Sequence, residues 1–182
     1  MPENLRTHYE KHIDINTVAK NGSASTKKPL ADARHLPGYF YTSEEIYELE
    51  KERIFLKDWL AIARVEEIGT PGDYKTMRLF DEPFIIARNK DGEIHAFHNR
   101  CAHRGVRVAE ESGNAKEFSC PYHGWLYDLN GRLLGAPYMR DTNNFDKKNC
   151  RLRSINLSIW AGWIFISFAE DPVPFDEFIA PY

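Results

Sequence analysis

The chain has 182 residues, enough for one domain of ordinary size and an extension. Its net charge of −3, with 28% charged and 42% hydrophobic residues, is typical of a soluble globular protein and argues against binding to nucleic acid or to an anionic membrane. No apolar run approaches the roughly 18 residues that cross a bilayer, and residues 1–6 carry neither an apolar signal core nor a twin arginine. We therefore expect a cytoplasmic protein.

The N-terminal part is expected to be a polar leader followed by one helix. Residues 1–36 are polar and include a stretch that is typical of a flexible tether. Thr42 and Glu45 have the spacing of a capping box, which predicts a helix from there to about Asp58. The buried side of this helix would carry Ile46, Leu49 and Ile54.

The rest of the chain has the pattern of short strands separated by turns. Asp91-Gly92 and Asn130-Gly131 are dipeptides that close tight hairpins. A strand spacing of about 8–12 residues predicts a mostly β fold, an antiparallel sandwich or barrel preceded by one α-helix. The expected strands are residues 59–65, 75–80, 84–88, 93–97, 126–127, 133–134 and 163–168.

The C-terminal part combines expected core aromatics with a polar break. From residue 171 onward the two closely spaced prolines Pro172 and Pro174 interrupt the pattern, as in a linker. The large aromatic side chains expected in the core are Trp59, Trp160, Trp163 and Phe165.

Two short segments each supply one cysteine and one histidine. Cys101 and His103 are separated by one residue, Cys120 and His123 by two, and sixteen residues lie between the pairs. Thiolate and imidazole bind zinc as well as iron–sulfur clusters, and two of each suit a tetrahedral zinc site. Zinc fingers usually take each ligand pair from one residue type, whereas here each segment mixes the two. The third cysteine, Cys150, lies in a polar stretch and is expected to be a free thiol.

The mixed ligand set favours an asymmetric two-iron cluster. If the cysteines bind one iron and the histidines the other, the oxidised cluster is formally neutral, whereas four cysteines would leave two negative charges. Histidine ligation therefore raises the reduction potential above the roughly −400 mV of plant-type clusters. Gly105 and Gly124 follow the histidines, and we expect them to bring the backbone close and direct N–H groups at the cluster sulfides.

The runs 101–105 and 120–125 resemble the Rieske [2Fe–2S] signature. More narrowly, the chain is similar to the N-terminal Rieske domain of the alpha subunit of Rieske non-haem iron oxygenases, the aromatic ring-hydroxylating family. The resemblance covers roughly residues 36–182 and implies a Rieske-type fold with the cluster loops at one tip. It also implies that Cys101 and Cys120 bind one iron and that His103 and His123 bind the other. Further matching runs are residues 96–100, 127–133 and 160–166.

The chain differs from Rieske proteins of respiratory chains. Those proteins have an additional cysteine in each loop, which together form a disulfide, and a serine two residues after the second histidine. Val106, Tyr122 and Trp125 stand at these positions here. Because fewer donors would then reach the sulfurs, we expect a midpoint potential near the low end of the Rieske range, about −150 mV. Trp125 is expected to shield the cluster by packing more than to donate its indole N–H.

The resemblance implies electron transfer within a larger enzyme. Such a domain accepts electrons from a ferredoxin or a flavin reductase and passes them to a mononuclear iron that uses dioxygen to hydroxylate an aromatic substrate or to demethylate a substrate oxidatively. In the family that iron is held by two histidines and a carboxylate in a downstream domain, and the full alpha subunit is a homotrimer. No histidine follows His123. We therefore assign no catalytic residue to this chain.

The expected organisation is a leader at residues 1–36, a Rieske domain with its helix at 37–170, and a linker at 171–182 toward a missing catalytic domain that would hold Fe(II). A fragment of a longer oxygenase is the favoured interpretation. The first alternative is a stand-alone Rieske ferredoxin that acts only as an electron carrier. The second is a zinc-binding interaction module, which two irons per chain would exclude.

Overall fold

The computed structural model describes residue 24 and residues 26–139 and 142–182. The chain divides into two compact units, Met1–Ile54 and Phe55–Tyr182. In the part of the chain that is described, no helix is both long and apolar enough to cross a bilayer. Most of the polar leader lies outside the described residues. The predicted domain limits at residues 36 and 170 stay predictions.

The first unit contains the predicted N-terminal helix, which is shorter than expected. The 3-10 turn η2 (Gly38–Tyr41) precedes α2 (Glu44–Glu50), and the π-helical segment η3 (Lys51–Phe55) continues from it. Helical structure therefore ends at Phe55 rather than at about Asp58.

The cap of α2 differs from the prediction by one residue. Ser43 is the N-cap, and its hydroxyl accepts a hydrogen bond from the N–H of Ile46 at 3.4 Å. Thr42 instead ends η2, where its own N–H donates to the carbonyl of Tyr39. Ile46 is buried as expected, but Ile54 is 46% exposed within the described part of the chain.

The second unit is built around a central antiparallel sheet with the strand order β4-β3-β2-β5. In β3, side chains alternate between the two faces of the sheet. Phe84 and Ile86 belong to one core cluster, and Ile85 and Ala87 belong to the other. This strand is therefore buried on both faces. The bounds of the strands are β2 Asp73–Leu79, β3 Glu82–Arg88, β4 Ile94–His98 and β5 Ser112–Asn114.

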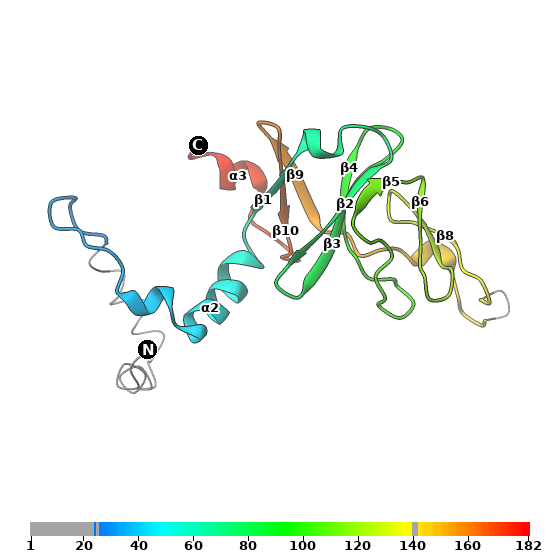
Figure 1. Cartoon of the computed structure of the whole chain (residues 1–182), viewed down its shortest axis with the longest axis horizontal. Coiled ribbons are helices and arrows are strands. Elements are labelled where there is room, and N and C mark those ends of the chain that lie inside the picture. Colours follow the sequence, from blue (N-terminus) through cyan, green and yellow to red (C-terminus); the bar gives the residue numbers. More distant parts are fainter. Residues whose placement is uncertain (1–23, 25, 140–141) are drawn as a thin grey trace. The chain divides into compact units, whose positions relative to one another are not determined.

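A second sheet packs on one face of the central sheet (Figure 1). It contains β1 (Leu60–Arg64), β10 (Trp163–Ser167) and β9 (Asn156–Trp160), in that order. Ile164 and Ile166 of β10 point into the core between the sheets. The alternation places Trp163 on the other face, where it pairs across the hairpin with Trp160. These two tryptophans are 42% and 41% exposed, so the expectation that they belong to the core is wrong.

The segment after residue 171 is attached to this outer face. It contains the short helix α3 (Phe175–Ile179), which lies beside β1, β9 and β10 in Figure 1. The Phe175 ring packs against Trp59 with ring centroids 5.1 Å apart and equally close to Phe165. The indole N–H of Trp59 donates to the carbonyl of Val173 at 2.7 Å. The expected linker therefore makes specific contacts with the domain.

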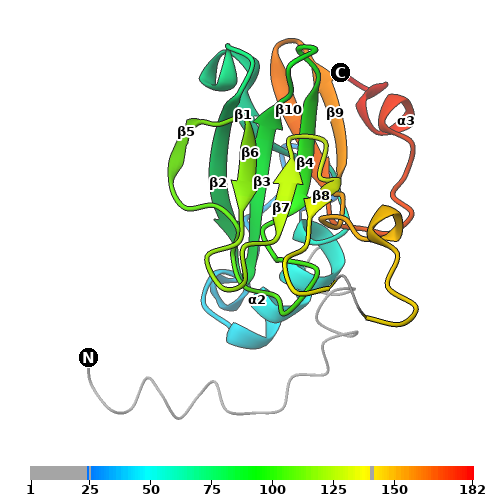
Figure 2. The same ribbon diagram turned by 90° about the vertical axis from the view of Figure 1, so that its right-hand side faces the viewer.

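A third sheet covers the other face of the central sheet, in front of β3 and β4 in Figure 2. Its antiparallel strands are β6 (Glu117–Ser119), β7 (Leu126–Asp128) and β8 (Leu133–Gly135). Phe118, Tyr127 and Leu133 from these strands join the core cluster that includes Ile85 and Phe97. The remaining short helices of this unit are η4 (Val65–Ile68) and η5 (Lys147–Asn149).

The hairpin turns and the cysteine–histidine segments lie at opposite ends of the sheets. The β3–β4 and β7–β8 turns meet at one end, where the buried amide of Asn89 donates to Asn130 at 2.8 Å. The two cysteine–histidine segments follow β4 and precede β7, so they leave the sheets at the other end. The predicted class, a mostly β antiparallel fold with one preceding helix and both segments at one tip, is confirmed.

Two glycines in the hairpin turns provide a test of how the central core limits the sequence. Gly92 and Gly131 have φ angles of +86° and +76°, but a Cβ on Gly131 would come within 2.6 Å of the Phe97 ring, whereas one on Gly92 would meet nothing within 4 Å. Gly92→Ala should lower the free energy of unfolding by about 1 kcal/mol through backbone strain alone. Gly131→Ala should lower it by about 3 kcal/mol, because Phe97 must also move. Equal losses in urea unfolding would contradict this account.

Candidate metal centre

The first cysteine–histidine segment is a tight loop after β4. The N–H of Cys101 donates to the carbonyl of Val106 at 2.8 Å, and the carbonyl of Cys101 accepts from the N–H of Gly105 at 2.8 Å. These two bonds close the loop around His103 and hold the cysteine at its base.

The second segment, between β6 and β7, repeats the same backbone scheme. The N–H of Cys120 donates to the carbonyl of Trp125 at 2.8 Å, and the carbonyl of Cys120 accepts from Gly124 at 3.0 Å. In both loops the glycine is four residues after the cysteine, although the histidine is two residues after it in one loop and three in the other. The two loops therefore share the same backbone hydrogen bonds but place the histidine at different positions.

The two loop glycines are required by backbone conformation. Gly105 and Gly124 have φ angles of +72° and +68°, in the left-handed region that favours glycine. Their N–H groups donate to the carbonyls of Cys101 and Cys120. The turns themselves use these two N–H groups, and the expectation that the glycines bring the backbone close to a cluster stays a prediction.

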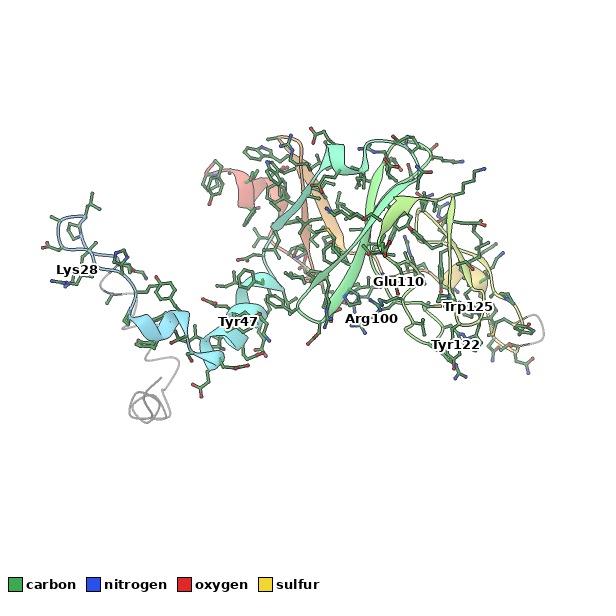
Figure 3. All side chains as sticks on the ribbon, in the orientation of Figure 1. Lys28, Tyr47, Arg100, Glu110, Tyr122 and Trp125 are labelled. Atoms are coloured by element: carbon green, nitrogen blue, oxygen red, sulfur yellow. The ribbon has the colours of Figure 1, made fainter. Side chains whose placement is uncertain are left out.

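All four predicted site residues come together at the tip. The side chains of Cys101 and Cys120 are each 3% exposed and belong to the same core cluster. The rings of His103 and His123 have centroids 4.6 Å apart and are inclined at 66°. Their neighbours Arg100, Tyr122 and Trp125 are labelled at this end of the domain in Figure 3. The arrangement thus pairs cysteine with cysteine and histidine with histidine.

Each histidine has one buried ring nitrogen that is not satisfied. The Nδ1 atoms of His103 and His123 are buried and have no hydrogen-bond partner among the described residues. Leaving a buried polar atom unpaired costs about 1–3 kcal/mol, so such atoms normally face a ligand. Two such unpaired nitrogens on adjacent rings indicate a site for a bound group.

The electrostatics of the metal-free site disfavour charge. Burial raises the pKa of the Cys101 thiol, and the neighbouring Cys120 raises it further. Desolvation lowers the pKa of His103, and the nearby His123 acts in the same direction. Neutral imidazoles are the form that binds a metal, whereas the thiols need a cation before they lose their protons.

Tyr127 is a contact of the site that sequence reasoning did not single out. Its hydroxyl oxygen lies 3.2 Å from Cys101 Sγ and accepts a hydrogen bond from the N–H of Ala102 at 3.1 Å. The side chain is fully buried, and burial raises the pKa of Tyr127 so that the hydroxyl keeps its proton. Since the oxygen already accepts from Ala102, its hydrogen can be donated to the sulfur. The sequence signals were its place close after the second loop and at the start of the matching run 127–133.

Trp125 packs directly on a predicted ligand. Its indole is parallel to the ring of His103, at 8°, with centroids 4.8 Å apart, and it is 3% exposed. The expected packing role therefore has a specific partner. Its Nε1 is also buried and has no hydrogen-bond partner in the described part of the chain.

Asn99 organises the first loop from beneath, and sequence reasoning did not identify this role either. Its side chain is 1% exposed. The amide oxygen accepts from the N–H groups of Val108 and Ala109 at 2.8 and 3.2 Å, and the amide nitrogen donates to the carbonyl of Ala109 at 2.8 Å. This side chain joins the end of β4 to the chain that returns from the loop.

The third cysteine is outside the two cysteine–histidine loops and packs against the same core cluster. Cys150 follows η5 and is partly buried, and the protein has no disulfide among its three cysteines. Within the described residues, no group of three or more His, Cys, Asp or Glu side chains is arranged around a single metal position.

Comparison with known proteins gives the class of the domain. Residues 58–146 match the family model described as the Rieske [2Fe–2S] domain. A solved structure of a quaternary ammonium Rieske monooxygenase in complex with L-carnitine superimposes with a TM-score of 0.76 and 35% sequence identity, over 82% of this chain and 43% of that chain. Residues 58–146 therefore form a Rieske [2Fe–2S] domain.

Curated relatives narrow the assignment to oxygenases. The alpha subunit of benzene 1,2-dioxygenase from Pseudomonas putida is 36% identical over 166 residues, which are 89% of this chain and 37% of the relative. The oxygenase subunit of glycine betaine monooxygenase from Pseudomonas aeruginosa (strain UCBPP-PA14) is 36% identical over 163 residues, 89% of this chain and 38% of the relative. This chain is therefore related to the Rieske part of oxygenase alpha subunits, and it spans about two fifths of their length.

The role of Asn99 can be tested by truncation. Asn99→Ala should lower the free energy of unfolding by about 3 kcal/mol, because three buried backbone groups lose their partner. Amide hydrogen exchange at Val108 and Ala109 should accelerate with it. Asn114→Ala is the control, since Asn114 is exposed and its amide bonds lie on the surface; it should cost less than about 1 kcal/mol. Similar losses in both variants would contradict the assigned role.

Proposed function

We propose that Cys101 and Cys120 bind one iron of a [2Fe–2S] cluster and that His103 and His123 bind the other through Nδ1. The observation that carries the proposal is the pair of buried, unpartnered Nδ1 atoms on adjacent rings, in the two loops that also carry two buried thiols. The donor set suits a cluster with two inequivalent irons. A bound cluster would remove the cost of the unpaired nitrogens and stabilise the two thiolates.

The cluster supplies one-electron redox chemistry, and the protein controls its surroundings. The buried cysteines keep water from the sulfur side, and the Trp125 ring fixes the plane of His103. The Tyr127 hydroxyl lies 3.2 Å from Cys101 Sγ and would donate to this sulfur once it is a thiolate. This donor stabilises added negative charge and is an interaction that the expected potential of about −150 mV did not include.

In the whole protein, the domain passes electrons from a ferredoxin or flavin reductase to a mononuclear non-haem iron. That iron would lie outside residues 1–182 and would use dioxygen to hydroxylate an aromatic substrate or to demethylate a substrate oxidatively. The relationship to a benzene dioxygenase and to a glycine betaine monooxygenase supports both reaction types. A homotrimeric, cytoplasmic alpha subunit is part of the same proposal, as are the domain at 37–170 and the connection at 171–182.

The reading frame that encodes the chain separates an oxygenase from a stand-alone Rieske ferredoxin. A continuation after Tyr182 that contains two histidines and a later carboxylate residue would support the oxygenase, because these are the ligands of a mononuclear ferrous site. A stop codon directly after Tyr182 would favour the electron carrier.

The ligand assignment predicts which cysteine and histidine variants lose the cluster and which variant keeps it. The purified chain should contain two irons and two acid-labile sulfides and show the absorption of a Rieske cluster. Cys101→Ser, Cys120→Ser, His103→Ala and His123→Ala should each lose this spectrum, whereas Cys150→Ser should keep it. One zinc per chain, or loss of the cluster in Cys150→Ser, would overturn the assignment.

The Tyr127 contact predicts a change in potential. Tyr127→Phe removes the donor to Cys101 and should lower the midpoint by about 40 mV, equivalent to about 1 kcal/mol of differential stabilisation. Tyr74→Phe is the control, since Tyr74 packs in the same core but its hydroxyl donates to the carbonyl of Glu110 at 3.4 Å. Protein-film voltammetry that gives the same midpoint for Tyr127→Phe and the unmodified chain would refute the contact.

A further inference from the structure

A groove beside Cys101 is lined mainly by arginine side chains. Its volume is about 520 Å³, and Arg100, Arg151 and Arg153 line it together with His98 and Glu82. Cys101 and Ala102 complete its wall, whereas neither His103 nor His123 lines it. The groove therefore borders the cysteine side of the candidate metal centre.

The backbone fixes the position of these arginines. The segment that carries Arg151 and Arg153 runs beside the end of β4, where the N–H of His98 donates to the carbonyl of Arg153 at 2.9 Å and Phe97 pairs with Ser154. Arg100 follows β4 directly, at the start of the first loop. Figure 3 labels Arg100 at this end of the domain.

The groove has an excess of positive charge. Glu82 is its one acidic lining residue, and its carboxylate lies 3.6 Å from Arg100 and 3.4 Å from His98. The Arg151 guanidinium donates to the backbone carbonyl of Asn130 in the β7–β8 turn and also lines a pocket at that end, so the charge of the groove rests chiefly on Arg100 and Arg153. In the part of the chain that the structure describes, no carboxylate forms an ion pair with Arg151 or Arg153.

The charges of the same arginines also affect the pKa of His98. Its side chain is 15% exposed, and burial is the main cause that lowers the pKa of His98. Glu82 opposes this shift, while the charges of Arg153 and Arg100 lower the pKa further. His98 therefore adds no charge near neutral pH, and the positive sign of the groove comes from the arginines.

The sign of the groove is opposite to that of the whole chain, whose net charge is −3. A negatively charged protein surface would be attracted to these arginines, which orients an encounter. Arg151 and Arg153 are exposed and Arg100 is 47% exposed, so their guanidiniums can contact carboxylates on another surface rather than enclose a small ligand.

We propose that this groove docks the acidic face of the electron-donor protein and that electrons enter on the Cys101 side. The proposal rests on the proposed electron-transfer function. It leaves the histidine side of the cluster for the electron acceptor. An acidic plant-type [2Fe–2S] ferredoxin is a suitable probe, since its potential of roughly −400 mV lies well below that expected for this domain.

The test compares two charge reversals in the cluster-containing chain. Arg153→Glu changes the groove, and Lys90→Glu makes the same change of charge in the β3–β4 turn, at the opposite end of the sheets. Stopped-flow reduction by the reduced ferredoxin at low ionic strength should slow about tenfold in Arg153→Glu and less than about twofold in Lys90→Glu. The difference should disappear at about 0.5 M salt, where the charges are screened.

With a cationic reductant, the charge reversal should change the reduction rate in the opposite direction. Reduction by the methyl viologen radical cation should become faster in Arg153→Glu, which a structural defect would not cause. Equal effects of the two reversals, or none, would overturn the docking proposal. Inhibition of the ferredoxin reaction by inorganic phosphate beyond that of chloride at equal ionic strength would also overturn it, in favour of a small-anion site.

Measurements on the cluster distinguish a failure of the docking proposal from a failure of the proposed function. Absorption spectrum, iron content and midpoint potential are measured on each variant before the kinetics. A chain without two irons contradicts the proposed function. A chain with its cluster intact, whose Arg153→Glu variant reacts as the unmodified protein does, contradicts the docking site alone.

Discussion

The two-sided burial of β3 and β4 is the constraint on which the rest of the domain depends. Phe84 and Ile86 face one covering sheet, while Ile85 and Ala87 face the other. Fully burying each large apolar side chain contributes about 1.5–3 kcal/mol, so the central sheet cannot shift against either neighbour without loss of both cores. The first loop follows β4 directly, and the second loop precedes a strand that packs on the same core. The relative position of the loops is therefore set by the packing of the sheets.

Much of this arrangement could be predicted from the sequence, because the signals are local. Residues 83–87 of β3 are an unbroken apolar run, and Asn130-Gly131 closes a hairpin through a positive φ angle. The cysteine–histidine spacing identified all four residues that meet at the tip. The failures concern the tertiary surroundings of a residue, which its local pattern does not specify. Trp160 and Trp163 lie on the outer face because Ile164 and Ile166 take the inner one. The contact between Phe175 and Trp59 joins residues that no local pattern connects.

The same distinction applies within the site. Residue type and spacing in the sequence identify the predicted ligands. The surroundings of these ligands depend instead on contacts that form only in the folded structure. Asn99 supports the first loop through bonds to Val108 and Ala109, and Tyr127 reaches Cys101 from another sheet. The loop glycines serve the turns themselves. The N–H of Gly105 bonds the carbonyl of Cys101, and its positive φ is what the turn requires.

Binding of a group at the tip would be coupled to the charge of the side chains there. Burial raises the pKa of the Cys101 thiol and favours its protonated form, and the Nδ1 atoms of His103 and His123 have no hydrogen-bond partner among the described residues. A bound cluster would satisfy the nitrogens and charge the thiols together, so that its binding energy and the folding energy of the tip become the same quantity.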